Sequence, residues 1–182
     1  MAGTMKKKLK IIIYIGVLIL SIAIQYSVIQ YLTLFGVKPN LPLIAVIMLG
    51  YLAGSETAVL SGFLLGLYQD AVSGKILGMY ALFYLYIGLI AGLISGKKQG
   101  KSLPISIVLT YVLSVVAASC TYLFGYMIPI MRSGHELSAG FLYVIGRIIV
   151  PEAFFNAVFC IPYYFILRIK QQEESGESIH VA

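Results

Sequence analysis

The chain has 182 residues, of which 60% are hydrophobic and only 11% are charged, and its mean hydropathy is +0.95. Soluble domains are about half apolar and about a quarter charged, so this composition excludes an ordinary soluble domain and indicates an integral membrane protein. The net charge of +6 does not indicate a nucleic-acid partner, because the cations lie in short runs beside apolar segments, where they orient a membrane protein and contact anionic lipid.

Six apolar segments follow a basic arm at residues 1–10. A spanning helix needs about 20 residues, so the chain has room for five or six spans and little else. We therefore predict an all-α, polytopic membrane protein with a transmembrane domain at residues 11–169 and a disordered polar tail at residues 170–182. The predicted segments run from Ile11 to Phe35, Leu41 to Ala53, Thr57 to Val72, Leu77 to Ser95, Leu103 to Ile130 and Leu137 to Ile169.

Two of these segments have unusual lengths. Residues 41–53 make a helix of only about 20 Å, so residues 41–53 and 57–72 either cross the membrane fully or form a re-entrant hairpin. We favour full crossings, because lipid penalises unpaired backbone at membrane depth. The last segment is too long for one straight span, and Pro151 and Pro162 are expected to kink it.

Lysine and arginine residues predict the orientation of the spans. With a cytoplasmic amino terminus, both termini are cytoplasmic, and the inner loops hold most of the cations. The inner set is Lys6, Lys7, Lys8, Lys10, Lys97, Lys98, Lys101, Arg168 and Lys170, against Lys38, Lys75 and Arg132 outside.

Small residues recur at every fourth position of the third segment. Gly54, Ala58, Gly62 and Gly66 line one helix face, and Asp70 follows at the next step. A face without side chains lets a neighbouring helix approach closely, which is how helices associate in lipid. We therefore predict a tight helix–helix contact that ends in one acid.

Three ionisable residues lie within or beside apolar segments: Asp70, Arg147 and Glu152. Such charges usually face the bundle interior and find partners, and all three could meet near the outer face. They could form a substrate or proton site, but a structural role is favoured, in which Asp70 pairs with Arg147 or caps nearby backbone.

Sequence motifs for catalysis or metal binding are absent. The chain has no HExxH, no GxSxG and no paired intramembrane aspartates, and its two cysteines lack metal-ligand spacing. We therefore expect no enzymatic activity, no cofactor and no catalytic or metal-binding residue.

Two sets of residues carry a resemblance to a known family. They are Pro39-Asn40-Leu41, Gly62-Phe63, Gly66-Leu67, Asp70, Ser73, Leu77-Gly78, Ala81-Leu82 and Tyr84, and then Pro151, Glu152, Asn156, Pro162-Tyr163 and Arg168. Together they are similar to the signature of MreD, the rod-shape-determining family. Asn40 stands where that family often has aspartate, so a role that needs an acid there is not expected.

The resemblance implies a six-span protein of the bacterial plasma membrane with no known enzymatic activity. The family acts with the bitopic protein MreC in the complex that directs lateral cell-wall synthesis, alongside MreB, RodA and a class B penicillin-binding transpeptidase. On this basis the expected function is a scaffold that maintains rod shape, with structural or interaction roles for Gly62, Gly66, Asp70, Gly78, Arg147, Glu152 and Asn156.

One alternative comes from a different functional class. A six-helix chain of this size and glycine content also resembles the substrate-binding subunits of energy-coupling-factor vitamin transporters, and the bundle is expected to be of that type. Those subunits dock through small-residue spacing in their first helix, where this chain offers only Ala23-x-x-x-Ser27. The Asp70 motif matches MreD and not these subunits, so we favour the scaffold.

Overall fold

The fold was analysed in a computed structural model that describes residues 2–29, 36–74, 77–96, 101–127, 130 and 141–175. Over these residues the chain is helical and contains no β-strand, which confirms the all-α prediction. The helices are α1 (Ala2–Ile24), α2 (Leu41–Ala53), α3 (Ser55–Ser73), α4 (Met79–Ser95), α5 (Leu103–Tyr122), α7 (Phe141–Val144) and α8 (Val150–Ser175). Three π-helical turns extend α1, extend α5 and join α7 to α8: η1 (Gln25–Ile29), η2 (Leu123–Met127) and η3 (Ile145–Ile149).

The predicted boundaries agree closely with the helices near the middle of the chain. α2 spans the predicted residues 41–53, and α4 begins two residues later than predicted. At the carboxyl end α8 continues to Ser175, so residues 170–175 are helical where a disordered tail was expected. The rest of that tail, residues 176–182, lies outside the described residues.

Within the described ranges, three helical stretches are long and apolar enough to cross a membrane. They are Lys10–Ser27, Leu103–Gly125 and Leu142–Arg168. α2 and α4 are apolar but shorter, with 13 and 17 residues. α3 has 19 residues and is interrupted by polar side chains. The chain is therefore a membrane protein in which short helices pack among long ones.

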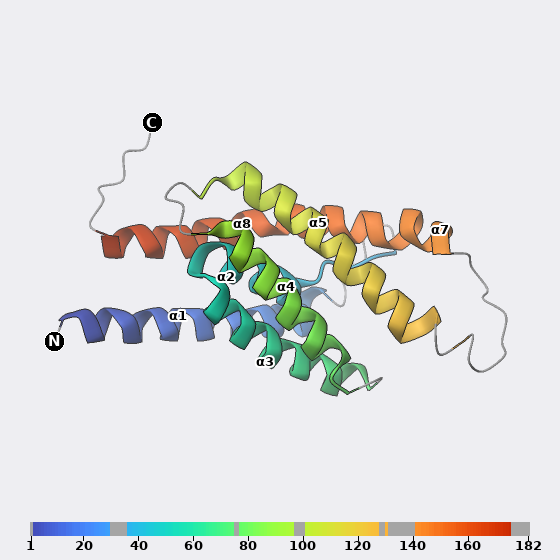
Figure 1. Ribbon diagram of the computed structural model, residues 1–182, viewed down its shortest axis with the longest axis horizontal. Coiled ribbons are helices and arrows are strands. Elements are labelled where there is room, and N and C mark those ends of the chain that lie inside the picture. The colour runs from blue at the N-terminus through green and yellow to red at the C-terminus, as the bar shows by residue number, and fades with distance from the viewer. Residues whose placement is uncertain are drawn as a thin grey trace.

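α2 lies at the centre of the bundle. Every residue from Leu41 to Leu52 is buried, and α2 packs against α1, α3, α4, α5 and α8. In Figure 1, α1 and α8 run nearly horizontally, while α3, α4 and α5 cross them diagonally. A helix that is surrounded in this way must be hydrophobic on all sides, and the sequence LPLIAVIMLGYLA meets that requirement.

The bundle has two distinct ends. At one end, on the left of Figure 1, α1 begins, α2 turns into α3, α4 leads to α5 and α8 ends. We call this the basic end, because Lys101 and Arg168 lie there. The opposite end, where α3 stops and α4 starts, we call the far end. The Lys101 Nζ atom donates to the Leu52 carbonyl at 2.6 Å, so the α2–α3 turn lies level with the α4–α5 connection.

α2 does not reach from the basic end to the far end. Its N-cap residue, Asn40, bonds to Asn156 of α8. Asn156 lies about 18 Å along α8 from Arg168, at 1.5 Å per residue, and the α7–α8 helix continues well beyond it toward the far end. Residues 36–40, which are not helical, lead into α2 at this mid-bundle position.

The long carboxyl-terminal segment departs from α-helical geometry at one of the two predicted sites. The π-helical turn η3 lies directly before Val150 and Pro151. Proline lacks an N–H group and its ring crowds the preceding turn of an α-helix, and a wider turn relieves that crowding. α8 continues as a helix through Pro162.

α3 and α4 form the closest helix pair in the bundle. A Cβ atom added at Gly66 would lie 2.3 Å from the Ala81 Cα atom, and one at Gly62 would lie 2.5 Å from the Tyr84 carbonyl oxygen. From the other side, a Cβ atom at Gly92 would lie 2.4 Å from the Ser55 Cα atom. The predicted contact through the small-residue face is thus present, and α4 contributes glycines of its own.

A methyl group at Gly66 should therefore destabilise the bundle. We expect Gly66→Ala to cost about 1–3 kcal/mol, because the backbones of α3 and α4 must move apart. The matched control is Gly16→Ala in α1, where a Cβ atom would meet nothing within 4 Å. Thermal unfolding of the two variants in the same detergent measures the difference, and equal melting temperatures would contradict the close contact.

Candidate functional site

Asp70 joins the far ends of α3 and α4. Its side chain is only 3% exposed. The Oδ1 atom accepts the Tyr80 N–H at 2.8 Å, and the Oδ2 atom accepts the N–H groups of Gly78 and Ala81 at 3.0 and 3.1 Å. These donors lie at the start of α4, where N–H groups have no partner within the helix and attract negative charge. A carboxylate from one helix therefore caps the next.

The loop between the two helices is shaped to bring these groups together. Gly78 is the N-cap residue of α4 and has a φ of +93°, a left-handed conformation that glycine adopts without a Cβ clash. Gly74 ends α3 with a φ of +62°, and its N–H group donates to the Asp70 carbonyl at 3.2 Å. Asp70 thus takes part in both helix ends.

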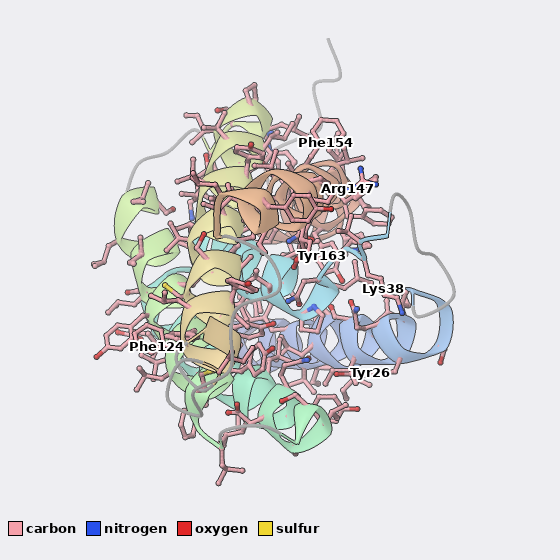
Figure 2. The ribbon with its side chains drawn as sticks, turned by 90° about the vertical axis from the view of Figure 1, so that its right-hand side faces the viewer. Tyr26, Lys38, Phe124, Arg147, Phe154 and Tyr163 are labelled. Atoms are coloured by element: carbon pink, nitrogen blue, oxygen red, sulfur yellow. The ribbon has the colours of Figure 1, made fainter. Side chains whose placement is uncertain are left out.

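The expected pairing of Asp70 with Arg147 is wrong. Arg147 lies on η3 with its side chain exposed, and within the described ranges no ion pair joins it to Asp70. In Figure 2, Arg147 lies near the upper edge of the bundle, whereas α3 runs along the lower edge. The alternative that Asp70 caps nearby backbone is the one observed, because three N–H groups already surround the carboxylate.

A second polar cluster lies at mid-bundle, around the start of α2. Asn156 of α8 is fully buried; its Oδ1 atom accepts the Asn40 backbone N–H at 2.7 Å, and its Nδ2 atom donates to Ser114 of α5 at 3.1 Å. The Tyr84 hydroxyl of α4 lies 2.8 Å from the Asn40 Nδ2 atom and 3.0 Å from its Oδ1 atom. We call Asn40, Tyr84, Ser114 and Asn156 the central polar cluster. It links α2 to three other helices.

The first turn of α2 has no free N–H group. The N–H of Leu41 donates to the Gln25 side chain at 2.8 Å, and that of Leu43 donates to the Asn40 Oδ1 atom at 3.2 Å. The residue between them is proline, and the N–H of Ile44 reaches the Asn40 carbonyl at 3.1 Å. A helix start that is buried in this way must have all its donors paired, since none can reach bulk water.

The other end of α2 is closed by groups at the basic end. Besides Lys101, which bonds to the Leu52 carbonyl, the Tyr51 hydroxyl donates to the Ser102 carbonyl at 3.2 Å. A cation at a helix carboxyl terminus is favourable, because the last carbonyls carry partial negative charge. Burial lowers the pKa of Lys101, and the carbonyl contact offsets part of the cost of burying its charge.

A cavity of about 380 Å³ opens beside the central polar cluster on its far-end side. Glu152 of α8 lines it and, within the described part of the chain, forms no hydrogen bond or ion pair. Neither Asp70 nor Arg147 lines the cavity, so the three ionisable residues, which could have met near the outer face, lie in three separate places. The lining residues are Asn40, Leu43, Tyr80, Tyr84, Ala117, Ala118, Thr121, Tyr122, Val144, Ile148, Ile149 and Glu152.

Several residues of these clusters were not singled out from the sequence as site residues. Asn40 followed by Leu41 and a proline has the form of a helix start, with an N-cap asparagine and proline in the first turn. Ser114 follows Ser106 and Thr110 at four-residue steps on the buried face of α5, and such hydroxyl groups often bond across helices in membranes. No local signal connects Lys101 to the end of α2, since 49 positions separate the bonded residues.

If Asp70 caps α4 rather than pairing with Arg147, substitutions at Asp70 and at Arg147 should have different effects on stability. In Asp70→Asn, an amide nitrogen replaces an acceptor that serves backbone N–H groups, so we expect a loss of about 1–3 kcal/mol of stability. Arg147→Gln should leave stability within about 0.5 kcal/mol, as for a surface change. Glu56→Gln, an exposed acid-to-amide change on the same helix, is the matched control. If Arg147→Gln destabilised the protein as much as Asp70→Asn does, the capping assignment would be wrong.

Comparison with known proteins identifies a family for the chain. The family described as rod shape-determining protein MreD matches residues 5–171. No curated protein and no solved structure matches the chain. The family match reaches from the first turns of α1 to the last turns of α8 and includes the Asp70 cap and the central polar cluster. The chain therefore belongs to the MreD family of rod shape-determining membrane proteins.

Proposed function

We propose that this protein is a non-enzymatic scaffold of the cell-wall elongation machinery and that it maintains rod shape by acting with MreC. The observation that carries the proposal is the family match over nearly the whole chain. The partnership with MreC, and through it with RodA, a class B penicillin-binding transpeptidase and MreB, is what membership of this family implies for the chain.

The use of polar groups in the bundle supports a structural role. Asp70 caps α4, and the central polar cluster closes the start of α2. These groups are therefore occupied by helix ends, and Asp70 lies away from the cavity that Asn40 and Tyr84 line. Among the described residues there is also no group of three or more His, Cys, Asp or Glu side chains placed to hold a metal ion.

We propose that the basic end faces the cytoplasm of a bacterial cell and that both termini lie on that side of the plasma membrane. Support comes from the excess of lysine and arginine at that end and from α1 beginning and α8 ending there (Figure 1). Six crossings follow if α2 is completed by residues 36–40. Labelling of a single cysteine at Lys98 by an impermeant reagent added to intact cells would contradict this orientation.

The six-crossing proposal is supported over a shallow re-entrant hairpin by the position of the α2–α3 turn. Lys101, which follows α4, bonds to the last turn of α2. The turn therefore lies as deep as the connection between the fourth and fifth predicted spans. The substrate site that Asp70, Arg147 and Glu152 could have formed is not present, because neither Asp70 nor Arg147 lines the cavity, and the vitamin-transporter alternative loses that support.

The scaffold role can be tested by co-purification and complementation. The tagged protein, captured from membranes in a mild detergent, should retain MreC, and it should restore rod shape after depletion of the resident MreD. Asp70→Asn should weaken both, because the far ends of α3 and α4 separate when their shared cap is lost. Glu56→Gln is the control for the chemical change alone.

The comparison is made at equal membrane levels, measured by blot, so that lost protein is not counted as lost binding. Full restoration of rod shape by a chain that retains no MreC would contradict the proposed partnership. If a variant retains MreC but does not restore rod shape, its defect lies in a step that follows formation of the complex.

A further inference from the structure

We propose that the cavity beside the central polar cluster binds an organic cation, with the ammonium group against Glu152 and the apolar part against the walls. This site goes beyond the proposed scaffold role. It is argued from three features of the cavity: an acid that has no partner among the described residues, the absence of free backbone donors at the start of α2, and walls of aromatic and branched apolar side chains.

Glu152 differs from the other polar groups of the bundle interior. Asp70 has three backbone donors, and Asn156 has partners on two elements. Glu152 lines the cavity and, among the residues that the structure describes, has no hydrogen bond and no ion pair. An acid at membrane depth is costly and normally faces a partner or a water-filled space. A cation in the cavity supplies the missing partner.

The neighbouring helix start does not provide a site for an anion. The amino terminus of a helix usually attracts anions through its free N–H groups. Here the N–H groups of Leu41, Leu43 and Ile44 are all bonded to Gln25 or Asn40. The cavity therefore presents one carboxyl group and no free backbone donor from α2.

The walls suit an ammonium group that carries an apolar chain. The rings of Tyr80 and Tyr84 lie edge to face with their centroids 6.0 Å apart, and both residues line the cavity with Tyr122. Tyrosine faces attract cations through the ring quadrupole. Val144, Ile148 and Ile149 complete the apolar side. A volume of about 380 Å³ is that of a small-ligand pocket.

The same ammonium chemistry is available from two sources, a soluble amine and the amine headgroup of a membrane lipid. The probe for the site is hexylammonium, and hexanol is its neutral counterpart of equal chain length. Binding is measured on the full chain in nanodiscs of phosphatidylglycerol, which contain no amine lipid. Binding is followed by the fluorescence of the chain's 14 tyrosines, with discs bounded by a synthetic polymer so that no scaffold-protein tryptophan interferes.

We expect saturable binding of hexylammonium and at least roughly tenfold weaker binding of hexanol, since the charge contact is worth one or more factors of ten. Glu152→Gln should remove this preference, whereas Glu56→Gln should keep it. Ala118→Leu fills the cavity and leaves Glu152 in place, so it should also abolish binding. This second variant keeps the test decisive if Glu152→Gln fails to fold.

The lipid source is tested by replacing half of the phosphatidylglycerol with phosphatidylethanolamine. Weaker hexylammonium binding in these discs, seen in the wild type but not in Glu152→Gln, assigns the site to the lipid headgroup; unchanged binding assigns it to a soluble amine. Equal binding of hexanol, or a cation preference that survives both Glu152→Gln and Ala118→Leu, overturns the proposal. Neither outcome bears on retention of MreC, so the cavity and the scaffold role fail separately.

Discussion

The bundle depends on closing the two ends of α2, a short helix that is buried on every side. A helix leaves its first N–H groups and its last carbonyls without internal partners, and in a lipid-surrounded bundle water cannot supply them. Asn40, Gln25 and Asn156 satisfy the start of α2, and Lys101 bonds near its end. Gln25 lies on η1, Asn156 lies on α8 and Lys101 lies just before α5. The bonds that close α2 therefore also hold these three segments around it.

The same requirement explains the acid at the far end. α3 and α4 approach so closely at Gly62 and Gly66 that the start of α4 is shielded by α3, and Asp70 is the side chain that reaches its N–H groups. Close packing and capping are therefore one feature: the glycine face brings the backbones together, and the carboxylate satisfies the donors that this approach buries. Among the described residues, Glu152 caps no helix and forms no hydrogen bond, and its side chain lines the cavity instead.

Much of this arrangement follows from local patterns in the sequence. Spacing of glycines predicted a close helix–helix contact on α3, though not that α4 is the partner, and apolar runs predicted the helices, because both signals act within one helix. The partners of Asp70, Arg147 and Glu152 could not be predicted in the same way. Charge alone favoured an ion pair, but on the helical segment that contains η3 and Pro151, Arg147 is exposed and Glu152 lines the cavity. Which side of a helix faces the interior depends on packing among segments that are distant in the sequence.

The most direct test of this account is amide hydrogen exchange at the start of α2 in nanodiscs. The N–H groups of Leu41, Leu43 and Ile44 should exchange as slowly as the centre of α2, although first-turn amides usually exchange fast. Asn156→Ala should accelerate them and leave Tyr80 and Ala81, which Asp70 caps, unchanged. Fast exchange of these three amides in the wild-type protein would contradict the claim that the buried ends of α2 organise the bundle.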